Sequence, residues 1–162
     1  MAKAKIQKKY LSGLSESTAA KRKAAFRKRI EGKQTGAARF KEVPGDPKGE
    51  TRPSRYTLSL GKMRDEISET AGKMKGSQDE RFVKAVATVT KIPKGIIQEV
   101  FDKGKAAWAV GHRPGASQAQ WARARVYSFL QKGKTVTKGP DELLYMKAKK
   151  ALDKKGEGIK LK

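Results

Sequence analysis

The feature that most constrains the fold is the stretch at residues 106–131, AAWAVGHRPGASQAQWARARVYSFLQ, which holds both tryptophans and the only histidine. Apolar residues recur at helical spacing on both sides of Gly-His-Arg-Pro-Gly, which predicts two helices joined by a short turn. Gly111 is expected to follow the first helix at positive φ, and Pro114 keeps Arg113 out of the helical region. Ser117 has the hydroxyl that the next N-cap needs.

The same turn is a candidate anion site. The first N–H groups of a helix have no partner inside it and carry partial positive charge, so Ser117 and the two residues after it could hold an anion. Arg113 would add a full charge beside them, and phosphate is the obvious anion. The alternative is a purely structural turn in which Arg113 reaches back to cap the preceding helix.

The net positive charge of the chain is the reason that phosphate is the first candidate anion. The formal net charge is +23, and such an excess opposes compaction unless a polyanion neutralises it. Residues 1–55 and 103–162 each carry +11, whereas residues 56–102 carry only +1. We therefore expect a helical body at residues 56–156, between a basic N-terminal part at 1–55 and a basic tail at 157–162.

The N-terminal part is predicted to contain a tail and a basic helix. Residues 1–13 are rich in lysine and are expected to be mobile without a partner. Ser15 and Gly32 suit the two ends of a helix whose apolar stripe is narrow. Its remaining surface marks six residues for phosphate binding, unless it is an ordinary solvated face: Lys21, Arg22, Lys23, Arg27, Lys28 and Arg29.

An extended arm is predicted to follow this helix. Residues 33–55 contain three prolines and three glycines, a composition that favours extended backbone. The arm would lie along the body or along a neighbouring molecule, with Phe40 and Tyr56 as anchors. A disordered tether fits the composition equally well.

The body is predicted to be a compact all-α bundle of about five helices. Apolar spacing places them near residues 58–76, 78–92, 93–110, 117–132 and 140–155. Ser77 and Glu80 have the spacing of a capping box, and Pro93 separates the second of these helices from the third. Gly104 either admits a closely packed neighbour or breaks the third helix. No stretch alternates over a length that could build a sheet.

The residues give little support to catalysis. His112 has no local signature of a catalytic triad, and the chain has no cysteine and no motif for a phosphate loop, zinc, calcium or a dinucleotide. The paired carboxylates fall in first helical turns, where they complement the helix dipole: Asp65-Glu66, Asp79-Glu80 and Asp141-Glu142. We expect no enzyme activity, no cofactor and no metal. No apolar run approaches the ~20 residues of a membrane-spanning helix, so no membrane insertion is expected.

Arginines interleave with aromatic residues after Ser117, and such a pattern can stack bases while pairing with phosphates. Arg123 is therefore a candidate. Arg125 lies about 200° further around the helix, so the two cannot serve one surface; one of them is expected to be internal, paired with a carboxylate such as Glu99 or Asp102. Three lysines of the last helix complete the predicted phosphate-binding set: Lys147, Lys149 and Lys150.

The central stretch resembles a known family. The run from Lys105 to Leu130, with its GHRPG and QWARARV pieces, is similar to a small domain of unknown function encoded by large DNA viruses of algae and by tailed phages, including phages of cyanobacteria. The similarity covers about residues 92–130. Tyr-Leu-Ser-Gly-Leu-Ser at residues 10–15, followed by a Lys/Arg-rich helix, is similar to a second segment from the same viruses. The resemblance implies a viral source and no particular mechanism.

Three classes of function are therefore weighed. The first is a structural protein of the virion, with its body bound to capsid or connector proteins and its basic ends bound to packaged nucleic acid, DNA ahead of RNA. The second is a non-virion nucleic-acid-binding accessory protein in replication, packaging or host takeover, and the third is an enzyme. We expect the first, with a place in the virion and, during assembly, in the host cytoplasm. Homo-oligomerisation is compatible with it.

Overall fold

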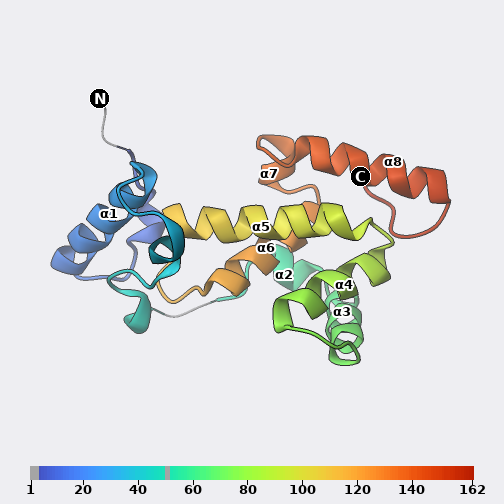
Figure 1. The fold of residues 1–162 in the computed structure, drawn as a ribbon, viewed down its shortest axis with the longest axis horizontal. Coiled ribbons are helices and arrows are strands. Elements are labelled where there is room, and N and C mark those ends of the chain that lie inside the picture. The colour runs from blue at the N-terminus through green and yellow to red at the C-terminus, as the bar shows by residue number, and fades with distance from the viewer. Residues whose placement is uncertain (1–3, 50–51) are drawn as a thin grey trace. The chain divides into compact units, whose positions relative to one another are not determined.

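The computed structural model describes residues 4–49 and 52–162. Across those residues the secondary structure is helical and contains no strand, as the sequence predicts (Figure 1). The part of the predicted tail at residues 1–3 lies outside the described residues. None of the described helices is long and apolar enough to cross a bilayer.

Eight α-helices and three short 3-10 helices make up the described chain, rather than one basic helix and five body helices. They are η1 (Lys8–Tyr10), α1 (Glu16–Ile30), η2 (Gly36–Phe40), η3 (Asp46–Lys48), α2 (Arg55–Ser59), α3 (Lys62–Gly72), α4 (Gln78–Thr90), α5 (Lys94–Val110), α6 (Gln118–Leu130), α7 (Lys134–Thr137) and α8 (Glu142–Lys155). The predicted helix at 58–76 is two helices, because Gly61 has φ 51° and ψ −124° and turns the chain between α2 and α3. The short helix α7 is the other addition.

The helices belong to two compact units. Unit 1 takes the chain up to residue 52 together with residues 105–121. Unit 2 takes residues 53–104 and 122–162. The sequence places residues 105–121 in the helical body, whereas in the structure they pack with the N-terminal part.

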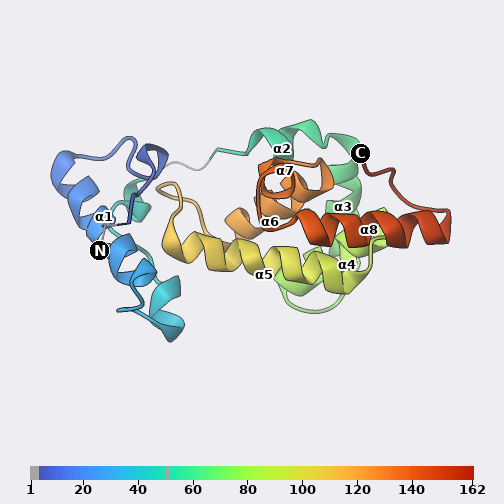
Figure 2. The same ribbon diagram turned by 90° about the horizontal axis from the view of Figure 1, so that it is seen from above.

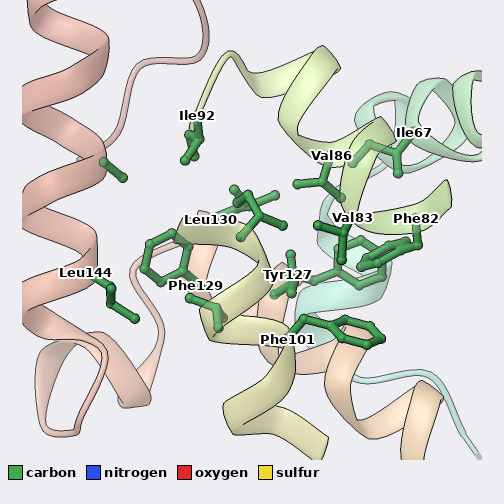
Figure 3. Packing of buried hydrophobic residues seen from close by; sticks show 14 of the residues in the cluster. Ile67, Phe82, Val83, Val86, Ile92, Phe101, Tyr127, Phe129, Leu130 and Leu144 are labelled. Carbon is green, nitrogen blue, oxygen red and sulfur yellow. The ribbon is translucent and has the colours of Figure 1, made fainter. Parts of the chain in front are cut away.

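Unit 2 has a single apolar core (Figure 3). Phe82 of α4 lies against Phe101 of α5 and Tyr127 of α6, with ring centroids 5.8 and 5.6 Å away. Phe129 packs edge-on against Tyr145 of α8 at 5.5 Å. At the edges, α3 packs against α4 and α7 against α8 (Figures 1 and 2). Burying side chains of this size is worth about 1.5–3 kcal/mol each, so this core accounts for much of the stability of unit 2.

Local signals in unit 2 behave as predicted. Ser77 and Glu80 form the reciprocal capping box at the start of α4. Gly104 admits a close neighbour and does not break α5, because a Cβ on it would lie 2.6 Å from the Cα of Ala122. α6 therefore crosses α5 at a point where only glycine fits.

The segment after α8 is docked on unit 2, although the sequence predicts a tail. The Ile159 N–H donates to the Thr90 carbonyl at 3.2 Å, and Ile159 and Leu161 pack against the core. Tyr145 Oη donates to the carbonyl of Lys162 at 3.1 Å. Both ends of residues 159–162 are thus held.

The predicted arm is also part of a folded unit. Val43 is buried with Ile6 and Phe26 in the small apolar cluster of unit 1, so neither residues 4–13 nor residues 33–49 form a free extension. Phe40, predicted as an anchor, is 42% exposed. Tyr56, the other predicted anchor, packs against the core of unit 2.

Candidate nucleic-acid interface

The loop between α5 and α6, residues 111–117, belongs to unit 1 and rests on a buried polar cluster. Gly111 is not at positive φ, contrary to the prediction. A glycine is needed there for another reason: a Cβ would lie 2.6 Å from Cε2 of Tyr10. The Tyr10 ring therefore closes directly over the end of α5.

His112 is fully buried at the centre of this cluster. Its ring stacks on Trp108, with centroids 4.0 Å apart and planes 7° apart, and meets Phe26 edge-on at 5.3 Å. Nδ1 lies 2.8 Å from the Trp108 carbonyl, and Nε2 lies 2.9 Å from Oδ2 of Asp46. A carbonyl can only accept a hydrogen bond, so Nδ1 carries a proton.

Asp46 is the partner of the second ring nitrogen of His112. Burial by itself would raise its pKa, but hydrogen bonds from His112, from the Val43 N–H and from Arg22, with the charge on His112, outweigh burial and lower that pKa to about 2. The carboxylate is therefore ionised at neutral pH and accepts the bond from Nε2. Both ring nitrogens of His112 therefore face acceptor groups, the Trp108 carbonyl and the Asp46 carboxylate.

Arg22 is the third member of the cluster and is fully buried. Its Nη1 donates to Oδ1 of Asp46 at 2.7 Å, and its Nη2 donates to the His112 carbonyl at 2.8 Å. Further bonds reach the Tyr10 carbonyl at 2.8 Å and the Pro44 carbonyl at 3.0 Å. The predicted phosphate contact at Arg22 is wrong, because its guanidinium is buried and hydrogen-bonded inside unit 1.

The predicted phosphate contact at Arg29 is wrong for the same reason. It is 3% exposed, and it donates to the Lys41 carbonyl at 2.6 Å and to the Ala109 carbonyl at 3.2 Å. Its guanidinium lies 5.8 Å from the Trp108 ring centroid. Burial lowers its pKa, against the charge of Asp46, which raises it. The spacing Arg22, Phe26, Arg29 follows one face of a helix, and that periodicity was the signal that could have identified both arginines as internal.

The other predicted residues of α1 face outward to different degrees. Lys21 and Lys28 are exposed, whereas Lys23 and Arg27 are half-buried. Nε of Arg27 also donates to the Ala4 carbonyl at 3.5 Å, a long bond. Four of the six predicted cations of this helix therefore stay within reach of a phosphate.

Arg113 is the exposed residue that the buried cluster supports. Arg22 holds the carbonyl just before it, and Trp108 Nε1 holds the Ala116 carbonyl at 2.7 Å. Beyond it, a Cβ on Gly115 would lie 2.4 Å from the Gly49 carbonyl oxygen, so two backbones meet there. Among the described residues, none accepts a bond from its guanidinium, so capping of α5 by Arg113 is not observed. A rigid loop thus presents one cation to solvent.

Ser117 caps α6 as predicted, and this weakens the predicted anion cradle. The Gln120 N–H donates to Ser117 Oγ at 3.1 Å. In return, the Ser117 N–H donates to Oε1 of Gln120 at 2.9 Å. This is the capping-box exchange with glutamine, and it occupies one of the N–H groups that the sequence assigns to an anion.

The two arginines of α6 that lie in unit 2 differ in their surroundings. Arg125 is the internal one and binds Asp141 through Nε at 3.0 Å and Nη2 at 2.8 Å. One internal arginine is thus confirmed, but its partner is Asp141 and not Glu99 or Asp102. Arg123 is partly buried, with Asp79 3.7 Å from its Nη2 and the Phe82 ring centroid at 5.4 Å. It is a poor candidate for a phosphate contact.

The predicted lysines of α8 are all exposed: Lys147, Lys149 and Lys150. The opposite face of the helix buries Leu144, Ala148 and Leu152 in the core of unit 2. Across residues 4–49 and 52–162, no three His, Cys, Asp or Glu side chains gather as a metal site requires.

Comparison with known proteins gives one match. The model of a family described as "Family of unknown function (DUF5824)" matches residues 7–147. The chain belongs to this family. No curated protein and no solved structure matches the chain significantly.

The DUF5824 match covers the whole buried cluster: it includes Arg22 and Arg29 of α1, Asp46 of η3 and the loop at 111–117. It ends within α8, at Lys147, so the remaining lysines of that helix and residues 157–162 lie outside it. The family region is therefore more than the central stretch that the resemblance covers.

Proposed function

We propose that this DUF5824 protein is a non-enzymatic structural protein of a virus particle, which contacts packaged nucleic acid through exposed cations and other particle proteins through the helices of unit 2. The observation that carries the proposal is where the charge lies. Burial removes only Arg22 and Arg29 almost completely from solvent among the predicted contacts, while lysines of α1 and α8 and Arg113 stay exposed in a chain of net charge +23.

Lysine-rich contacts of this kind act mainly on phosphates. Each phosphate neutralised releases counterions, which drives binding without reading base sequence. Arg113 differs from the lysines because its loop is held on both sides by buried bonds, so less order is lost when it pairs with a phosphate. Duplex DNA is the expected ligand ahead of RNA.

Contact with other particle proteins is supported by apolar side chains that unit 2 leaves in solvent. Leu143 and Met146 on α8 are 72% and 61% exposed, and Leu58 on α2 is 61% exposed. The resemblance to proteins of phages and algal viruses supports the virion as the setting. The second candidate, a non-virion accessory protein that binds nucleic acid, shares the charge argument and differs in location.

The first test is binding of the full chain to a random-sequence duplex over a salt series. Replacing Lys147, Lys149 and Lys150 together by glutamine is expected to lower the slope of log K against log salt by about 0.9 for each phosphate that the variant no longer neutralises. The control replaces Lys62, Lys73 and Lys75, which removes the same charge from the nearly neutral part of the chain. Equal effects of both triple variants, or no binding at low salt, would refute phosphate binding by α8.

Arg113→Gln tests the loop in the same assay. We expect weaker binding with unchanged thermal unfolding, because the side chain is exposed and the loop is held by other residues. Deleting residues 1–55 is unsuitable, since residues 105–121 pack with them. Mass spectrometry of gradient-purified particles of the encoding virus separates the two candidates: a stoichiometric copy number supports the virion protein, and absence from particles supports the accessory protein.

A further inference from the structure

A pocket of about 310 Å³ opens on unit 2, away from the residues used above. It is formed by α2, the end of α6 and the segment after α8. Its lining contains three cations and no acidic residue: Arg55, Tyr56, Ser59, Leu130, Gln131, Lys160 and Lys162. The volume lies at the lower end of the range for small-molecule sites, about 300–1,000 Å³.

Two of the cations reach the pocket because of how residues 159–162 alternate. Ile159 and Leu161 pack against the core, so Lys160 and Lys162 project to the other side. The Ile159 N–H bond to Thr90 and the Tyr145 hydroxyl bond to Lys162 fix this segment at both ends. The two lysines are therefore held on the pocket wall by the docked backbone.

Arg55 and Tyr56 form another part of the lining, and hydrogen bonds order it. Nη2 of Arg55 donates to the Tyr56 hydroxyl at 2.9 Å, and its guanidinium lies 4.8 Å from the ring centroid. Gln131 ties the wall to α6, since its Nε2 donates to the carbonyls of Tyr56 at 2.7 Å and Tyr127 at 3.0 Å. Ser59 Oγ donates to Oε1 of the same glutamine. These bonds set Arg55 in place without using all of its donors.

We propose that this pocket binds a nucleotide through its phosphate. Arg55, Lys160 and Lys162 pair with the phosphate through charge-assisted hydrogen bonds. Tyr56 and Leu130 provide the apolar surface that a nucleoside covers. The pocket cations lie in the predicted basic ends at residues 1–55 and 157–162, but none of them is among the individual phosphate contacts predicted on α1, α8 or the loop at 111–117, so separate variants test the two proposals.

The test is titration of the full chain with AMP, adenosine and inorganic phosphate at low salt, by calorimetry and by amide chemical shifts. AMP is expected to bind more tightly than either fragment and to shift the amides of Ser59 and Gln131. Arg55→Gln with Lys160→Gln should weaken AMP binding about tenfold or more, a change of roughly 1.4 kcal/mol or more. The control, Lys75→Gln with Lys94→Gln, removes the same charge from exposed positions of unit 2 outside both proposed sites and should change it less than about twofold.

Three results would refute nucleotide binding in the pocket: equal weakening of AMP binding by the control variant, binding of inorganic phosphate as tightly as AMP, or amide shifts centred elsewhere. Both pairs of substitutions replace exposed side chains, and unchanged thermal unfolding verifies the fold. An oligonucleotide with a 5′-phosphate separates the sources of the ligand. If it binds at least as tightly as AMP, the pocket holds a strand end; if it binds more weakly, the pocket holds a free nucleotide. The duplex salt slope should be the same in the pocket variant and in the native chain, so either proposal can fail alone.

Discussion

Unit 1 and unit 2 are stabilised by different interactions. Unit 2 buries an apolar core shared among its helices, with Phe82, Phe101 and Phe129 near its centre. Unit 1 has only a small apolar cluster, and its largest fully buried side chain is Arg22. A short basic segment can thus fold when its arginines bond to backbone carbonyls that other segments supply.

The energetic character of the two units follows from this. A buried arginine loses its hydration, and that cost is offset only when its donors are all bonded with good geometry. In Arg22 every guanidinium nitrogen is bonded, to the carbonyls of Tyr10, Pro44 and His112 in three separate segments and to the Asp46 carboxylate. Apolar cores tolerate substitutions of similar volume, whereas such a bonded cluster tolerates almost none.

The largest expected effect is at Arg22. Arg22→Met removes one of the three partners of Asp46 and leaves three backbone carbonyls without their donor. Breaking a buried ion pair in this way costs about 3–5 kcal/mol. Hydrogen exchange should show lost protection in residues 105–121, with protection retained around Val83 and Val86 in unit 2. Lys21→Met, on the exposed side of α1, is the control and should change stability by less than about 0.5 kcal/mol. Equal loss of protection in both units would contradict the view that different interactions stabilise them.

Acid should loosen unit 1 through Asp46. Its folded pKa of about 2 is below the ordinary value, so ionised Asp46 contributes stability above the unfolded pKa, and that stability is lost as pH falls toward 2. About 2–3 kcal/mol should disappear between roughly pH 5 and pH 2. The measurement is the stability of unit 1 by hydrogen exchange against pH. Asp46→Asn should remove this dependence; if the dependence persists, another carboxyl causes it.

A glycine substitution tests how closely α5 and α6 pack in unit 2. Gly104→Ala should destabilise it by about 1–3 kcal/mol, because the new Cβ meets Ala122 backbone, even though alanine favours helix by about 1 kcal/mol. Gly95→Ala in the same helix has open space around its Cβ and should not destabilise. Urea unfolding of both variants tests this. If Gly104→Ala leaves the stability unchanged, α5 and α6 do not pack closely there.

The smallest expected effects come from two matched helix caps. Ser77 starts α4 in unit 2, and Ser117 starts α6 in unit 1. Replacement of either by alanine should cost about 1 kcal/mol. Hydrogen exchange should locate the loss in unit 2 for Ser77→Ala and in unit 1 for Ser117→Ala. Loss in the same unit for both would argue against the division of the chain.

Local parts of the fold could be predicted from the sequence. The caps at Ser15, Ser77 and Ser117 and the glycine after α8 follow from residues within one helical turn, and so did the all-α class. Gly61 was missed because the apolar period continues through it. The folding of residues 33–49 was missed because composition cannot show contacts with residues 60 or more positions away.

The candidate site was predicted only in its exposed part. The predicted contacts that solvent reaches are Lys21, Lys28, Arg113 and the lysines of α8. Arg22 and Arg29 look like their neighbours in sequence, and only the carbonyls of distant segments distinguish them. The pocket at Arg55 could not be foreseen, since it needs the docking of residues 159–162 on a core formed by other helices.

Unit 1 is built from two segments that are far apart in the sequence, so it cannot close until the second segment has been synthesised. Residues 4–49 leave the ribosome before residues 105–121 exist, and at about 5–20 residues per second the gap lasts several seconds. Throughout that interval Arg22 and Arg29 lack their carbonyl partners at His112 and Ala109. The nascent N-terminal segment therefore exposes its full positive charge beside the RNA of the ribosome, and closure of the unit withdraws two of those charges once α5 and the following loop emerge.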